Sequence, residues 1–298
     1  MGAVTRVACW RIHSTRDILM ALDYAALDAV MRHLSNPSPF LSSAPPAPRT
    51  GIHVLAVAGN WYDLPHKAPV LARLASHRPS ATLLLTGGRD ERLTPPRAVE
   101  LGGEPMMLQS QLHELHNVSR SRMVIYSGSR ITNHNLRAML MFASTTHAFE
   151  RRAVNLQIVE EAFLVRREAA AFRALLNRDS AAASALDSVH IRPVGARSFD
   201  QLVNTHGGRV DVALALVLGE VTRLRQYSNA SRHSADDEVL LPAEAAQLDD
   251  SLSASVDRML VEQRDRLLSS GRALLGDRTR LFASGAAPRA VGDGLDGG

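Results

Sequence analysis

Short apolar runs alternate with segments of helical periodicity through the middle of the chain. Four apolar runs, at residues 52–58, 81–86, 123–126 and 154–159, have the length and composition of strands that are buried on both faces. The segments between them repeat apolar side chains every three or four positions, as amphipathic helices do. This alternation predicts an α/β fold with a doubly wound, mostly parallel sheet.

Further elements are predicted on both sides of this span. Residues 17–34 mostly follow a helical period, and residues 189–194 read as a fifth strand. Residues 210–224 are apolar nearly all round and predict a buried helix, while Pro242 is expected to open a longer helix with one apolar stripe. We therefore expect additional N-terminal and C-terminal helices that cover the core.

These elements divide the chain into four parts. An N-terminal helix and a linker with five prolines occupy residues 1–50, and the α/β core occupies residues 51–195. A mainly helical region at residues 196–283 is expected to pack on that core. The tail at residues 284–298 is rich in glycine and alanine, and it is expected to be disordered.

Charge and composition argue against a nucleic-acid partner. The chain carries 34 basic and 30 acidic residues, the arginines are dispersed among the acidic residues, and only 4% of residues are aromatic. Proteins that bind nucleic acids usually gather basic residues with aromatic side chains on one surface. Lys67 is the single lysine among the basic residues, a skew that is typical of codon bias.

The single cysteine and the hydropathy pattern indicate a cytoplasmic protein. Cys9 is alone, which excludes an intramolecular disulfide and a cysteine-based metal site and fits a reducing compartment. No apolar run approaches the roughly 18 residues that a membrane span needs. The first residues lack the apolar core of a secretory signal, and Arg6 stands where a myristoylation motif requires Ser or Thr.

The stretch at residues 121–143 reads as a strand, a polar loop and a helix in one piece, with Met123, Val124 and Ile125 expected to be buried on both faces. Ligands of parallel sheets bind outside the carboxyl ends of strands, and a following helix N-terminus attracts anions. The loop is expected at residues 127–135. Its candidate ligand-binding side chains are those of Ser129, Thr132, Asn133 and Asn135. The alternative is that Ser129 or Thr132 only caps the helix.

Two other predicted strands end in turns that let the backbone approach a ligand. These turns are Gly59-Asn60 and Gly87-Gly88. Neither the glycine pattern of dinucleotide-binding proteins nor that of phosphate-binding loops occurs, so those cofactors are not predicted. His113 and His116 are spaced to share a metal ion but have no third ligand in the sequence, and no metal site is predicted.

Charged residues gather where the helix after the fourth strand begins. Arg166 and Arg167 lie in its first turns, where the helix dipole disfavours cations, and neither has a carboxylate three or four residues away. Their partner is therefore either an anionic ligand or a distant Glu or Asp. Glu160 and Glu161 either favour the same dipole or bind ribose hydroxyls. Adjacent residues at a strand end point in opposite directions, which argues against one shared catalytic site.

Several segments in this order are similar to a known bacterial family. They are LAVAGN at 55–60, LLLTGG at 83–88, Glu104 ahead of its helix, Ser129 and Asn135, RREAAAFR at 166–173, LGEVTRLR at 218–225 and LPAEAA at 241–246. The chain thereby resembles the YdcF-type family, a domain shared with SanA and ElyC. The resemblance implies a Rossmann-like fold that binds S-adenosylmethionine beside the two glycine turns and the 129–135 loop. The family usually has glutamates where this chain has Tyr126 and His134.

Two functions follow as hypotheses. The first is a soluble small-molecule-binding protein of the YdcF type, with S-adenosylmethionine or a related adenosyl or nucleotide ligand at the strand ends and no assigned reaction. The second is a hydrolase or transferase whose phosphorylated or glycan-linked substrate is held by Arg166 and Arg167. The candidate ligand-binding residues are Gly59, Asn60, Gly87, Gly88, Glu104, Ser129, Thr132, Asn135, Glu160, Glu161, Arg166 and Arg167.

Overall fold

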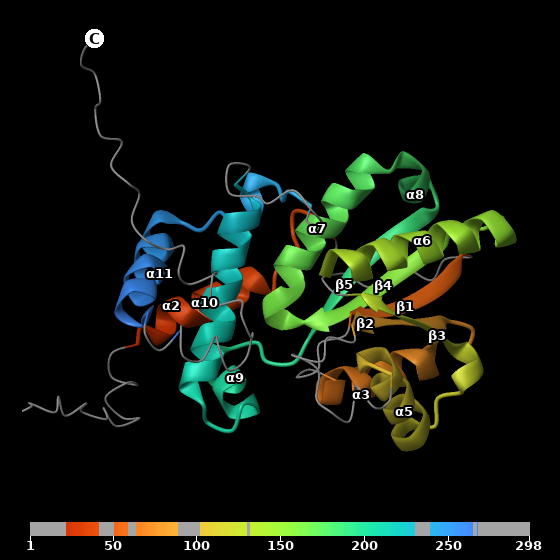
Figure 1. Ribbon diagram of the computed structural model, residues 1–298, viewed down its shortest axis with the longest axis horizontal. Helices are drawn as coiled ribbons and strands as arrows, with labels where there is room; N and C mark the ends of the chain where they lie inside the picture. The colour runs from red at the N-terminus through yellow and green to blue at the C-terminus, as the bar shows by residue number, and fades with distance from the viewer. Residues whose placement is uncertain are drawn as a thin grey trace, which may run out of the picture.

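A five-stranded parallel sheet forms the centre of the molecule (Figure 1). The computed structural model describes residues 22–41, 51–58, 64–88, 102–129, 132–229, 239–264 and 267. The strands are β1 (Ile52–Ala58), β2 (Thr82–Gly88), β3 (Met123–Ser129), β4 (Val154–Glu161) and β5 (Leu186–Val194), in the order β3-β2-β1-β4-β5. Every neighbouring pair is parallel, so the predicted doubly wound α/β fold, Rossmann-like in its strand order, is confirmed.

The sheet separates two hydrophobic cores because successive side chains of a strand point to opposite faces. In β1, Val54 and Ala56 belong to the larger core, while Leu55 and Val57 belong to the smaller one. The central strands β1 and β4 are buried along most of their length. The continuous apolar runs in the sequence therefore mark strands that are covered on both sides.

Helices cover each face of the sheet. The smaller core packs against α3 (Leu64–His77) and α5 (Glu104–His116), and the larger core packs against α6 (Thr132–Glu150) and α7 (Val165–Arg178). The chain thus leaves β1 towards one face and β4 towards the other, although the two strands are neighbours. The position between β1 and β4 is the topological switch point of the sheet, where Rossmann-like folds bind their ligands.

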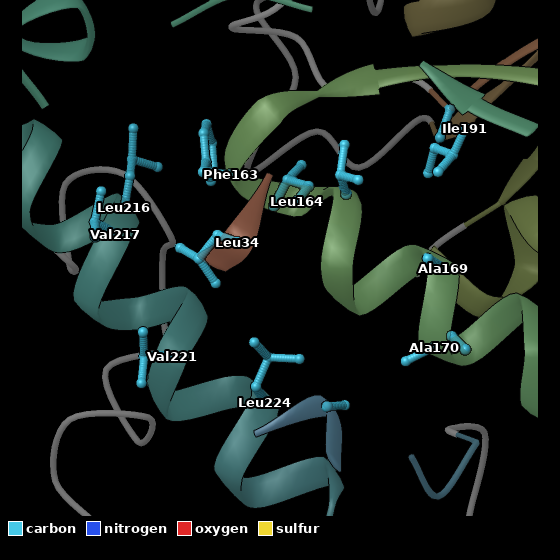
Figure 2. Close-up of a cluster of buried hydrophobic side chains, with 14 of the residues drawn as sticks. Leu34, Phe163, Leu164, Ala169, Ala170, Ile191, Leu216, Val217, Val221 and Leu224 are labelled. Atoms are coloured by element: carbon cyan, nitrogen blue, oxygen red, sulfur yellow. The ribbon is translucent and has the colours of Figure 1, made fainter. Parts of the chain in front are cut away.

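A helical group beside the sheet completes the larger core (Figure 1). Its helices are α2 (Tyr24–Leu34), α9 (Phe199–Thr205), α10 (Val210–Tyr227) and α11 (Asp250–Glu262). Figure 2 shows Leu34 of α2 and Val217 and Val221 of α10 around the buried turn that carries Phe163 and Leu164. Shorter elements are η1 (Arg120–Arg122), η2 (Ala162–Leu164), α8 (Ser180–Ser184) and η3 (Ala243–Ala245). The N-terminal and C-terminal helices pack on the same core.

The strand at residues 123–126 was expected to be buried on both faces, and this prediction is wrong. β3 lies at the edge of the sheet, and the side chain of Val124 is 38% exposed. The strand also continues to Ser129, and α6 begins at Thr132, so the polar loop is shorter than the predicted 127–135 segment. An apolar run shows that a segment suits a strand but does not give its position in the sheet.

The helix expected from Pro242 is divided in two. Pro242 precedes only the short turn η3, and α11 begins after Asp249, whose side chain accepts a hydrogen bond from the Leu252 N–H at 2.8 Å. An aspartate at the N-cap satisfies a backbone N–H of the first turn, which favours the start of α11 at this position. The fifth strand is also longer than expected, since β5 begins at Leu186.

Part of the predicted organisation lies outside the described residues. This holds for the tail at 284–298, most of the proline-rich linker, and Gly59 and Asn60. Within the described ranges, no helix combines the length and apolar character that crossing a membrane would require.

Replacing Phe172 with Ala is expected to lower the free energy of unfolding by about 3–5 kcal/mol, because it opens a cavity in the larger core. Phe172 is fully buried on α7, whereas Phe149 at the end of α6 is 83% exposed. Phe149→Ala is the matched control and should change stability by less than about 0.5 kcal/mol. Urea unfolding of both variants measures the difference, and equal effects would contradict the assignment of α7 to the core.

Candidate functional site

The ends of neighbouring parallel strands bring several predicted site residues to one edge of the sheet. Gly87 and Gly88 end β2, Ser129 ends β3 beside Gly88, and Glu160 and Glu161 end β4. We call this edge the carboxyl edge. Gly59 and Asn60 directly follow β1 in the sequence and lie outside the described residues.

Lys67 joins the two central strands at this edge. Its side chain is fully buried on α3, and its Nζ donates to the backbone oxygen of Ala58 at 2.8 Å and to Oε1 of Glu160 at 2.6 Å. Ala58 ends β1, and Glu160 lies at the end of β4. The ammonium group therefore bridges the strands on either side of the switch point.

Two further carboxyl groups surround this pair. Oε1 of Glu160 also accepts the N–H of Glu161 at 2.8 Å. Glu168 of α7 is hydrogen-bonded to Glu160, and burial, together with the neighbouring charge of Glu160, raises the pKa of Glu168 well above its ordinary value. We call Lys67, Glu160, Glu161 and Glu168 the switch-point cluster. It connects helices on opposite faces of the sheet through the end of β4.

Glu161 occupies a pocket of backbone next to β5. Its Oε1 accepts the N–H of Ala196 at 3.2 Å, and a Cβ atom at Gly195 would lie 1.9 Å from that oxygen. Gly195 has a φ of +75°, a conformation that glycine adopts without strain. Burial raises the pKa of Glu161 to about 7, an effect that Lys67 opposes and Glu160 strengthens.

Arg167 has a distant carboxylate as its partner. Its Nε donates to Oε1 of Glu220 on α10, and Oε2 of Glu220 accepts from Arg223 at 3.2 Å. Burial alone would lower the pKa of Arg167, but Glu220 and Glu168 raise it above its ordinary value. The sequence left two possible partners for this arginine, an anionic ligand or a distant Glu or Asp, and Glu220 is a partner of the second kind.

Arg166 donates to backbone carbonyl groups from both ends of the described chain. Its guanidinium nitrogens lie 2.9 Å from the oxygen of Ser38, 2.8 Å from that of Glu244 and 2.9 Å from that of Ala245. The group also stacks over the ring of Phe40 at 5.4 Å, and burial lowers its pKa. Both arginines thus have protein partners, and the phosphate clamp stays a prediction.

Glu104 lies at the start of α5 and reaches the end of β2. Its Oε2 accepts the N–H of Gly88 at 3.1 Å. A Cβ atom at Gly87 would lie 2.9 Å from Cδ of Pro105 and 3.1 Å from Oε2 of Glu104. The space that Gly87 leaves is therefore used by the N-terminus of α5, which explains this glycine by close packing.

The remaining candidates lie where β3 passes into α6. Ser129, Asn133 and Asn135 are buried, and Thr132 begins the helix. Oδ1 of Asn135 has no hydrogen-bond partner among the described residues. Helix capping and ligand binding both stay predictions for Ser129 and Thr132. Nδ1 of His113 donates to the backbone oxygen of Val118 at 3.1 Å. The described residues contain no group of three side chains suited to a metal ion.

Three residues that pair with the predicted charged residues, Lys67, Glu168 and Glu220, were not among the predicted site residues. Lys67 carried a signal, because it is the one lysine in a chain that otherwise uses arginine, but that skew was assigned to codon bias. Glu220 also carried one, since it is a carboxylate within the apolar segment at 210–224. Glu168 follows the arginine pair, and its sequence position did not indicate that it faces Glu160.

No protein-family model and no curated protein matches the chain. The resemblance to the YdcF-type family therefore stays a prediction that rests on the quoted segments.

Arg167→Ala is expected to destabilise the protein by about 3–5 kcal/mol, because it leaves the buried carboxylate of Glu220 without its main partner. Arg209→Ala is the matched control, since Arg209 and Asp211 form an exposed ion pair that contributes at most about 1 kcal/mol. Urea unfolding measures both. A loss below about 1 kcal/mol for Arg167→Ala would contradict the structural role and favour the ligand clamp.

Glu161 should make the protein less stable as the pH rises. Its folded pKa of about 7 exceeds the ordinary value of 4.5, so between these values the folded state binds more protons than the unfolded state. This contribution to stability is complete below about pH 4.5, and roughly 3 kcal/mol of it is lost as the pH rises through 7. Glu161→Gln should remove that part of the fall. Identical pH profiles of unfolding for both proteins would contradict the assignment.

Proposed function

We propose that this protein binds a small molecule with an adenosyl or nucleotide-like group at the carboxyl edge of its sheet, and that S-adenosylmethionine is the first ligand to test. The observation that carries the proposal is the switch point between β1 and β4. Ligands of doubly wound sheets bind outside the strand ends at this position, where the chain departs to opposite faces.

The charge of this edge favours a ligand that is cationic or rich in hydroxyl groups. Glu104, Glu160 and Glu161 end or cap the central strands, and Lys67 is engaged by Glu160. Carboxylates accept hydrogen bonds from ribose hydroxyls, and they attract positive charge such as that of a sulfonium ion.

The resemblance to the YdcF-type family supports the same ligand, since Gly87, Gly88 and Glu104 belong to the matching segments. The proposal assigns no reaction, because the glycine-rich loop of the common methyltransferases is missing from LAVAGN at 55–60. We extend the proposal to a cytoplasmic location on the basis of the single cysteine.

S-adenosylmethionine should raise the melting temperature of the protein, and a concentration of 100 times its Kd corresponds to about 2.7 kcal/mol of added stability. Glu104→Gln should weaken binding roughly tenfold, because a charge-assisted hydrogen bond or a favourable charge is lost. Glu262→Gln on α11 is the control and should bind as the wild type does. Calorimetry measures each affinity, and no binding of S-adenosylmethionine or its demethylated product at millimolar concentration would refute the proposal.

A further inference from the structure

The switch-point cluster contains more carboxyl groups than cations. Glu160, Glu161 and Glu168 are each at most 2% exposed, and Lys67 is the ammonium group that faces them. The next cation, Arg167, is engaged by Glu220. Carboxylates that share a buried site cannot all ionise, because their repulsion adds to the cost of desolvation. The cluster therefore retains at least one proton.

The three carboxyl groups differ in their contacts. Oε1 of Glu160 accepts hydrogen bonds both from Nζ of Lys67 and from the N–H of Glu161. Glu168 is hydrogen-bonded to Glu160, and burial raises the pKa of Glu168 well above its ordinary value, so Glu168 holds a proton. Glu161 is the third carboxyl group of the cluster.

Glu161 is the member of the cluster whose hydrogen bonds come from backbone N–H groups alone, those of Ala162 and Ala196. Its Oε2, like Oε2 of Glu168, is buried and has no hydrogen-bond partner among the described residues. The groups that face Glu161 are Lys67 from α3, Glu160 from its own strand, and the backbone N–H groups of Ala162 and Ala196. A buried acceptor without a partner costs free energy, which a proton or a ligand on Oε2 would offset.

We propose that Glu161 is the acid–base group of the carboxyl edge, which holds a proton on Oε2 in the free protein and releases it when a basic or positively charged ligand group, an amine or an onium ion, arrives beside it. Only the O–H bond of Glu161 breaks. Its proton passes to the amine, or to water or buffer when an onium ion takes its place. The choice of ligand rests on the proposed function, whereas the acid–base role rests on the cluster alone.

A lysine at position 67 suits the switch-point cluster better than an arginine would. Among the described residues the other buried cations are Arg166 and Arg167, so burial by itself does not require lysine. A compact ammonium fits between the ends of two adjacent strands, where it reaches the Ala58 oxygen and Glu160 together. Its position beside Glu161 also makes it a sensitive reporter of that carboxyl group.

The single lysine allows a direct test. Protein that is labelled with ¹³C and ¹⁵N in lysine gives one side-chain NMR signal, that of Lys67, which is followed from pH 5 to pH 9. The signal should show an inflection near neutral pH as Glu161 ionises. Glu161→Gln should remove the inflection, and the exposed control Glu262→Gln should retain it. The absence of an inflection in the wild type, or its persistence in Glu161→Gln, would overturn the acid–base role.

A matched pair of ligands tests the exchange of the proton. S-adenosylmethionine and S-adenosylhomocysteine differ in the sulfonium charge, and calorimetry in buffers of different ionisation enthalpy counts the protons released between pH 6 and pH 7. S-adenosylmethionine should release more protons than its neutral counterpart, and Glu161→Gln should abolish the difference. Equal release by both ligands would overturn the exchange. Failure of both ligands to bind would refute the proposed function, and the lysine signal would still decide the role of Glu161.

Discussion

The ion pair between Lys67 and Glu160 is the contact on which the arrangement of the carboxyl edge depends. It spans the boundary between β1 and β4, which is the place where the chain changes faces, and both charges are fully buried. Burying two charges costs several kcal/mol, and the cost is offset only when further hydrogen bonds satisfy the pair. The Ala58 oxygen and the Glu161 N–H supply such bonds. The pair therefore fixes α3, both central strand ends and, through Glu168, the start of α7.

The sheet could be predicted from the sequence because its information is local. An apolar run such as 154–159 shows that a strand forms, and this strand is buried on both faces because it lies inside the sheet. The order of strands is not local information, which is why the edge position and exposure of Val124 were missed. At the C-terminal helices two local signals competed, and the aspartate cap at position 249 prevailed over Pro242.

The site was predictable only in part, for the same reason. The position of Arg166 and Arg167 against the helix dipole correctly indicated that each needs a partner from outside its helix. The partner of Arg167 could not be predicted from the sequence, because Glu220 follows it by 53 residues and no local pattern connects the two. Lys67 was missed for a different reason. The excess of arginine over lysine was interpreted as a property of the whole chain, so the single lysine was not considered as a site residue.

The hydrogen bonds of Arg166 have a consequence for the synthesis of the chain. One guanidinium group on α7 receives its carbonyl partners from a turn at Ser38 and from η3 at Glu244 and Ala245. A ribosome releases the chain in order, and contacts between distant segments form only after the later segment has emerged. α2 also packs against α10 and α11. The first described helix therefore completes its burial only after the last one has been synthesised.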